Sequence, residues 1–207
     1  MKVKTTLFLV IMAEAMVILL GVYIYGWNIE HFTGMSGSGF TMNLEGLRAT
    51  TRFSGRLSLF IFSFIFLLYP NSKSTLSSIL SENFYLVFAV AHGIHLIELL
   101  SYVSLSGTVL VPYRVAGGFF AYLLIFSMPV LYARRNAGKL AEQRFNLLGF
   151  VYIFYVWFVF FMTYVARLSG GFSKPGESQI EHRVLMGWLC VMLGIKIFGL
   201  FIKKTKA

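Results

Sequence analysis

The chain has 207 residues, of which 57% are hydrophobic and only 13% are charged, and its mean hydropathy is +0.75. Soluble domains are about a quarter charged, so this composition excludes an ordinary soluble protein and predicts an integral membrane protein without a separate soluble domain. The net charge of +10 does not indicate nucleic-acid binding, because the basic residues flank apolar stretches instead of alternating with aromatics. The single cysteine excludes an intrachain disulfide and any Cys-based metal motif.

The hydropathy pattern predicts one all-α domain over residues 1–207, a bundle of six transmembrane helices. Each apolar stretch is close to the roughly 20 residues that cross a bilayer. The first stretch begins like a signal peptide, and Ala13-Glu14-Ala15 has the form of a cleavage site. Apolar sequence resumes at once, which favours an uncleaved span, with cleavage after Ala15 as the alternative. The six expected spans are 6–26, 53–70, 83–104, 108–132, 146–168 and 183–203.

The links between the spans orient the bundle. The polar, glycine-rich segment 28–51 is expected to be the largest loop, and the link after the fourth span is basic. Lys and Arg are more numerous on one side when both termini and the second and fourth links share it. The positive-inside rule then places both termini in the cytoplasm, and we expect a bacterial inner (plasma) membrane.

The third span carries three ionisable residues, His92, His95 and Glu98, in AVAHGIHLIELLSYV. Such groups cost kilocalories each in hydrocarbon, so they normally face a bundle interior and mark a functional site. Helical spacing places His95, Glu98 and Tyr102 on one stripe, with His92 at its upstream edge. One histidine would ligate a metal or haem, or relay protons. The alternative is a purely structural stripe, with a His95–Glu98 bond as its simplest contact.

A metal site on this helix alone is unconvincing, because its three residues climb roughly 9 Å at about 1.5 Å per residue. A zinc or di-iron site would need further ligands from Glu14, His31 or His182. Glu14 lies in the first span, where it could instead pair with a histidine or with Lys196 of the last span.

Two arginines, Arg52 and Arg56, open the second span. Arginine at a bilayer edge commonly binds phospholipid headgroups. Its guanidinium group equally suits an anionic cofactor group such as a haem propionate.

Several short motifs of residues 45–168 resemble the ferric-reductase-like transmembrane domain family, which includes ferric reductases, NADPH oxidases and the haem subunit of a methionine sulfoxide reductase system. The resemblance rests on the order of these motifs along the chain. The second span begins with a small residue, Gly and Arg and ends in Tyr-Pro, and the third span contains a histidine followed by Ser-Tyr. The fourth span follows a proline, and a basic link precedes the aromatic fifth span. The matching residues are Ser54-Gly55-Arg56, Tyr69-Pro70, His95, Ser101-Tyr102, Val111-Pro112-Tyr113 and Tyr152.

The resemblance implies haem b ligated by His95, with His92 as the rival ligand and Arg52 or Arg56 near the propionates. The family also places histidines in the fifth span, but no histidine occurs here between Leu96 and Glu181. The second ligand would then be His182 or a methionine, or the haem would be five-coordinate. The candidate methionines are Met162, Met186 and Met192.

Three functions follow from these patterns. The first is a membrane b-type haem protein in electron transport, between a quinol or partner flavoprotein and an acceptor. Any oxidoreductase activity would need a partner redox protein, because no flavin- or nicotinamide-binding segment is present. The second is a haem-less relative that serves as a subunit or assembly factor of a membrane complex. The third is a proton-coupled membrane enzyme or transporter that uses His92, His95 and Glu98.

Overall fold

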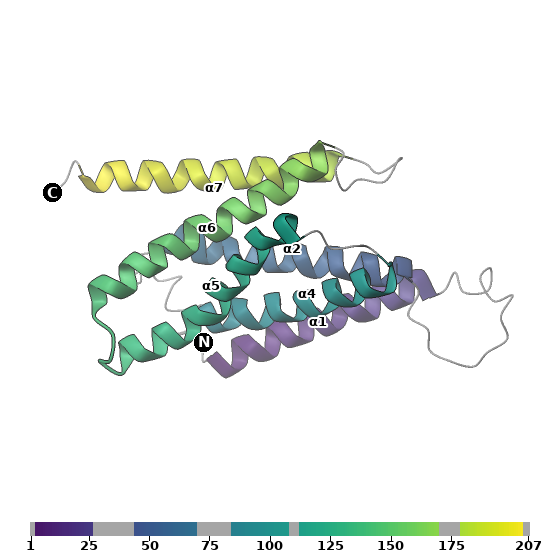
Figure 1. The fold of residues 1–207 in the computed structure, drawn as a ribbon, viewed down its shortest axis with the longest axis horizontal. Coiled ribbons are helices and arrows are strands. Elements are labelled where there is room, and N and C mark those ends of the chain that lie inside the picture. The colour runs from purple at the N-terminus through teal and green to yellow at the C-terminus, as the bar shows by residue number, and fades with distance from the viewer. Residues whose placement is uncertain (1–2, 27–43, 70–83, 108–111, 170–178, 205–207) are drawn as a thin grey trace, which may run out of the picture. The chain divides into compact units, whose positions relative to one another are not determined.

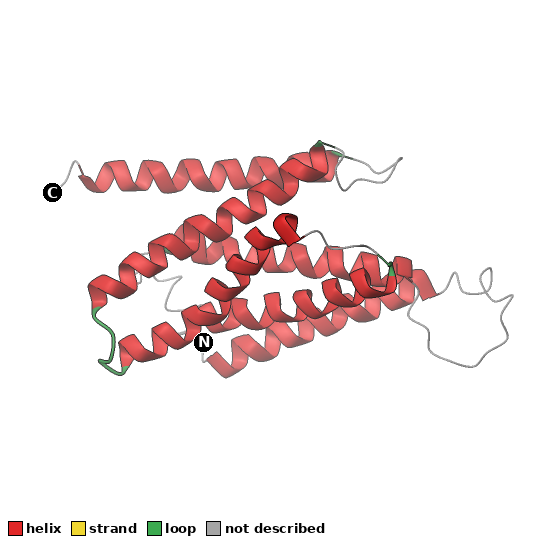
Figure 2. Cartoon of the chain, in the orientation of Figure 1, coloured by secondary structure: helices red, strands yellow, loops and turns green. Residues whose placement is uncertain are grey.

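The structure is a computed structural model that describes residues 3–26, 44–69, 84–107, 112–169 and 179–204. The described chain is helical apart from short turns, and no strand occurs in it (Figure 2). Figure 1 labels the helices in chain order. They are α1 (Val3–Gly26), α2 (Leu44–Leu68), α4 (Phe84–Leu105), α5 (Pro112–Asn136), α6 (Glu142–Leu168) and α7 (Ile180–Lys204).

Five of these helices are long and apolar enough to cross a membrane. Helices suit this environment because they satisfy the hydrogen bonds of their own backbone where no water is present. The spans are Gly46–Leu68, Phe84–Leu105, Val115–Asn136, Glu142–Leu168 and Ile180–Gly199, and α1 holds a shorter apolar stretch, Leu7–Leu20. The protein is therefore an α-helical membrane protein.

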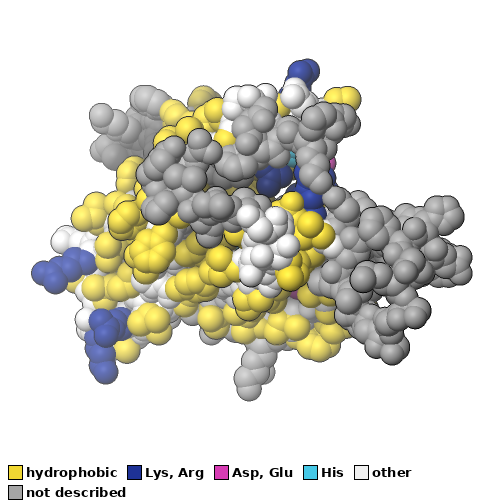
Figure 3. All heavy atoms as spheres, turned by 45° about the vertical axis from the view of Figure 1, so that its right-hand side comes forward, with side chains coloured by type: hydrophobic (Ala, Val, Ile, Leu, Met, Phe, Trp, Pro, Cys, Tyr) yellow, Lys and Arg dark blue, Asp and Glu magenta, His cyan; other side chains and the backbone are white. Residues whose placement is uncertain are grey.

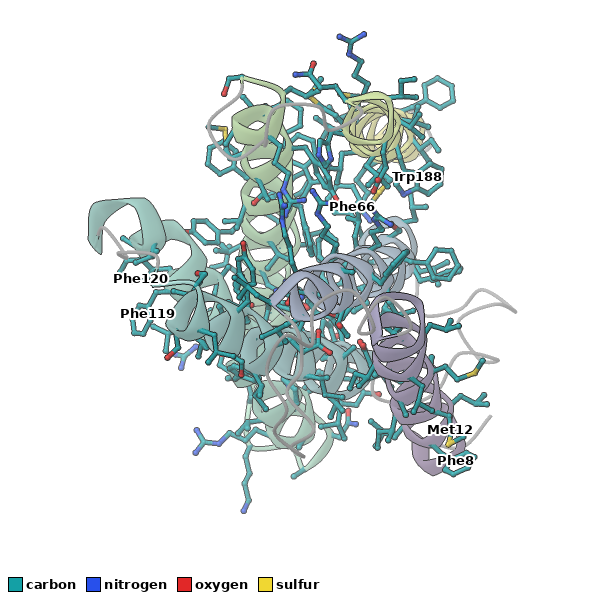
Figure 4. The ribbon with its side chains drawn as sticks, turned by 90° about the vertical axis from the view of Figure 1, so that its right-hand side faces the viewer. Phe8, Met12, Phe66, Phe119, Phe120 and Trp188 are labelled. Carbon is teal, nitrogen blue, oxygen red and sulfur yellow. The ribbon has the colours of Figure 1, made fainter. Side chains whose placement is uncertain are left out.

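Large apolar side chains cover much of the outer surface of the described helices (Figure 3). Phe8 and Met12 project outward from α1, and Phe119 and Phe120 do so from α5 (Figure 4). Phe8, Phe119 and Phe120 are each more than half exposed. Water would penalise this exposure, whereas lipid chains are as apolar as these side chains and cover them.

The start of α2 corrects the predicted extent of the loop 28–51. The helix begins at Leu44, so the end of that polar segment is helical. The hydroxyls of Thr50 and Thr51 donate to the carbonyl oxygens of Gly46 and Leu47, at 2.6 and 2.8 Å. These bonds satisfy the hydroxyl groups of both buried threonines within the helix. Polar residues can therefore lie inside α2, and they do not indicate a loop here.

The chain divides into two compact units. Unit 1 comprises residues 1–61 and 78–115, and unit 2 comprises residues 62–77 and 116–207. Unit 1 therefore holds α1, most of α2 and α4. Unit 2 holds the end of α2, nearly all of α5, and α6 and α7.

In unit 1, α1 packs against α4, and the two run side by side (Figure 1). Fully or almost fully buried apolar residues form its core on α2 and α4, namely Leu47, Leu59, Val87, Phe88 and Ala91. Buried polar residues interrupt this core on all three helices, and these residues form the candidate site.

In unit 2, α6 packs against α7, and two phenylalanines from the end of α2 pack on α6. The Phe62 ring lies 5.4 Å from the Phe160 ring, and the Phe66 ring lies 5.6 Å from that of Phe154, centroid to centroid. Trp188 of α7 donates from Nε1 to Ser63 Oγ at 2.9 Å. Aromatic packing and a buried hydrogen bond thus join the end of α2 to both helices.

The C-terminal end of α2 is capped by a lysine. Lys196 of α7 is buried, and its ammonium group donates to the carbonyl oxygens of Phe66 and Tyr69. It also lies over the rings of both residues. The last carbonyls of a helix lack intrahelical partners and carry the negative end of its dipole, so a cation stabilises them.

Candidate functional site

The candidate site lies in unit 1, where α4 presents His92, His95 and Glu98 at intervals of three residues. This spacing places the three side chains on neighbouring positions of one helix face. His92 and Glu98 are 9% and 7% exposed, and His95 is half-buried. The polar stripe expected from the sequence is therefore buried at two of these three positions.

A serine on α2 joins the stripe into a hydrogen-bonded chain. Ser54 is fully buried, and its Oγ lies 3.0 Å from His95 Nδ1. The same hydroxyl donates to Glu98 Oε2. Ser54 thus links the Glu98 carboxyl group to the His95 imidazole.

The residue after this serine lets α2 approach the imidazole closely. A Cβ on Gly55 would lie 3.0 Å from His95 Cε1, 3.4 Å from Nε2 and 3.5 Å from Nδ1. Any larger side chain would have to displace the ring, because ordinary carbon contacts are about 3.5–4.0 Å. Gly55 therefore sets the distance at which Ser54 meets His95.

The second histidine extends the site toward the start of α4. The His92 ring stacks on Phe88 at 5.1 Å and lies 5.4 Å from the His95 ring, centroid to centroid. The two imidazoles are therefore direct neighbours on one face of α4.

The third helix contributes a carboxyl group. Glu14 of α1 is 1% exposed, and neither of its carboxylate oxygens has a hydrogen-bond partner among the described residues. It interacts electrostatically with Glu98 of α4, the helix on which α1 packs. The suggested partner Lys196 belongs to unit 2 and holds the end of α2. Among the described residues, Glu14 therefore interacts with a second carboxyl group, while Lys196 has its partners at the end of α2.

Three further predicted residues flank this cluster in unit 1. Arg52 and Arg56 are half-buried on α2, and the Arg56 guanidinium lies 4.8 Å from the Phe53 ring centroid. Tyr102 is half-buried further along α4 and makes none of the hydrogen bonds of the cluster. His31 lies outside the described residues.

The remaining predicted haem residues belong to unit 2. His182 is 4% exposed on α7, and its ring lies 6.2 Å from that of Tyr164. Tyr152 is fully buried on α6, edge-on to Phe62. Met192 is fully buried and accepts a hydrogen bond from Ser63, whereas Met162 is 44% exposed.

In unit 1, His95 would be the residue to hold a haem iron. Nδ1 of His95 is held by Ser54, which is in turn bonded to Glu98, as the outer partners of a ligating imidazole usually are. His92 lies three residues away on the same helix, so these two histidines cannot occupy opposite faces of one haem. In the described part of the chain, no group of three or more His, Cys, Asp or Glu side chains could hold a metal ion.

Sequence reasoning missed the role of Ser54, although it noted the Ser54-Gly55-Arg56 motif. The available signal was a run of small hydroxyl residues on α2. These residues are all buried: Thr50, Thr51, Ser54 and Ser58. Hydroxyls at positions i and i+4 share a helix face and recur where membrane helices hydrogen-bond to one another.

The chain matches no family model, no curated protein and no solved structure. The likeness to the ferric-reductase-like domain stays an expectation drawn from short motifs.

Proposed function

We propose that this protein conducts protons within the membrane through a relay of Glu98, Ser54 and His95. One observation carries the proposal: a single buried serine hydroxyl lies between a buried carboxyl group and an imidazole. Ionisable groups inside a membrane are costly and are found mainly where they move protons or ions. Three such groups on one face of α4, linked to α2, satisfy that condition.

The relay depends on the ability of the Ser54 hydroxyl to donate one hydrogen bond and accept another at the same time. A hydroxyl has one proton to donate and two lone pairs to accept with, so Ser54 can donate to one neighbour while it accepts from the other. When Ser54 donates to Glu98, the bond to His95 requires a proton on Nδ1. A proton that arrives at His95 Nε2 then releases the Nδ1 proton to Ser54, and the hydroxyl proton passes to Glu98.

The wider arrangement belongs to the same proposal. Helix α1 would complete a sixth span, because its apolar stretch Leu7–Leu20 is flanked by further helix on both sides. Both termini would lie in the cytoplasm of a bacterial inner membrane, as the distribution of Lys and Arg favours.

The test is proton flux in liposomes that contain the purified protein and an internal pH-sensitive dye. An imposed membrane potential should drive protons through the wild-type protein. Glu98→Gln should lower the rate by roughly 100-fold, the contribution that a positioned proton donor or acceptor typically makes to a rate. Glu142→Gln is the matched control, since that glutamate is exposed at the start of α6 and pairs with Arg135. Wild-type flux no faster than in empty vesicles, or equal flux in both variants, would contradict the proposal.

A second function is favoured by the orientation of His95. Because Ser54 holds Nδ1, the imidazole would present Nε2 to a haem iron, with Arg52 or Arg56 for the propionates. Haem supplies one-electron chemistry when bound, and a quinol or partner flavoprotein would be the donor. Protein purified from haem-replete cells should then show a Soret band that shifts on reduction and is lost in His95→Ala. A colourless preparation with no haem by pyridine hemochrome assay rejects this second function and leaves the relay standing.

A further inference from the structure

Glu14 is a buried carboxyl group that the relay described above does not use. It lies on α1, which packs against α4, and it is 1% exposed, whereas Phe8, Met12 and Met16 of the same helix are 61%, 46% and 58% exposed. One face of α1 therefore meets lipid, and Glu14 belongs to the opposite face. A carboxylate in such a place, without donors, would be very costly if ionised.

Glu98 offers the matching half of a pair. Ser54 occupies its Oε2, while Oε1 is buried without a hydrogen-bond partner among the described residues. Both oxygens of Glu14 are in the same condition. Two ionised carboxylates here would repel each other, whereas one proton between them removes the repulsion and supplies the missing donor.

The other ionisable groups of α2 and α4 do not replace that proton. None of them hydrogen-bonds to either carboxyl group in the described structure. Among the side chains that the structure describes on these two helices, these groups are Arg48, Arg52, Arg56, Tyr85, His92, His95 and Tyr102.

We propose that Glu14 and Glu98 share one proton, which Glu14 carries and donates to Glu98 Oε1, so that α1 becomes the next station of the relay. The assignment of the proton follows from the hydrogen bonds. Ser54 donates to Glu98 and stabilises its ionised form, while Glu14 has no donor. The inference rests on the proposed proton transfer and names a further residue for it.

Infrared spectroscopy of the protein in liposomes tests this pair, because a protonated carboxyl group has its own carbonyl stretch, distinct from that of a carboxylate. Wild-type protein at neutral pH should show this band, and the band should shift in D₂O. Glu14→Gln should abolish it. Glu98→Gln should keep the band but move it, since the protonated carboxyl then has a different hydrogen-bond partner. Glu142→Gln should leave it unchanged.

Absence of the band from wild-type protein would overturn the shared proton without reference to any variant. A band that survives in Glu14→Gln, or that stays in place in Glu98→Gln, would overturn it as well. These outcomes are separable from the relay itself. Proton flux without the band rejects the pair and keeps the relay, and the band without flux rejects the relay and keeps the pair.

Discussion

Replacing Gly149 with alanine should destabilise unit 2 by forcing Tyr69 out of its place. A Cβ at Gly149 would lie 2.5 Å from Tyr69 Oη and 2.8 Å from both Cε2 and Cζ. Carbon contacts are comfortable at about 3.5–4.0 Å, so the ring must move by roughly 1 Å. The phenol donates to the Asn146 carbonyl oxygen at 2.6 Å, and such a shift would break this bond.

The expected loss combines three effects. Overpacking costs about 1–3 kcal/mol, and the lost hydrogen bond about 0.5–1.5 kcal/mol. The higher helix propensity of alanine returns about 1 kcal/mol. The free energy of unfolding should therefore fall by about 0.5–3.5 kcal/mol. Burial and the nearby Glu142 carboxylate raise the pKa of Tyr69, against a smaller opposing effect of Arg135, so the phenol remains a donor throughout the neutral range.

Denaturant titration in detergent micelles measures this change. Gly187→Ala on α7 is the matched control, because no atom lies within 4 Å of its new Cβ, and it should be neutral or slightly stabilising. In a Tyr69→Phe background the cost of Gly149→Ala should shrink, since the phenol bond is already absent. If the free energy of unfolding of Gly149→Ala equals that of Gly187→Ala, the close contact of Tyr69 with Gly149 on α6 is refuted.

Two further substitutions test other contacts. Gly55→Ala should displace the His95 ring, whose Cε1 would lie 3.0 Å from the new methyl, and the ¹⁵N signals of that imidazole should shift; unchanged signals would refute the contact. Lys196→Met should lower the free energy of unfolding by about 1.5–3 kcal/mol, because it removes a charged donor to carbonyls that include that of Tyr69. Lys139→Met, an exposed control, should have almost no effect in the same denaturant titration, and equal losses would contradict the cap.

The sequence predicted where the helices begin and end better than it predicted which face of each helix is buried. Apolar length alone located all six helices within a few residues, apart from the earlier start of α2 at Leu44. Apolar residues surround α1 and α4 on every side, so hydropathy could not show which side meets lipid. Only the polar stripe of α4 carried that information, and there the expectation of a buried Glu98 was confirmed.

The partners of the stripe could not be predicted in this way. Serine is common in membrane helices, and Ser101 bonds to the Ile97 carbonyl oxygen of its own helix. The run of hydroxyl residues on α2 marks a polar face, but it does not show which hydroxyl meets His95. The rotation of α2 about its axis decides which hydroxyl meets His95, and packing sets that rotation. Similarly, the charges of Glu14 and Lys196 suggested a pair, whereas Lys196 caps α2.

Proton flux through Ser54→Ala protein in liposomes tests the relay most directly, because this substitution removes the bridging hydroxyl and leaves both His95 and Glu98 in place. The account predicts that the flux falls by roughly 100-fold relative to wild type. Ser101→Ala, which also removes a hydroxyl from a membrane helix, should retain the wild-type rate. Wild-type flux in Ser54→Ala, measured on protein that unfolds like wild type, would contradict the account.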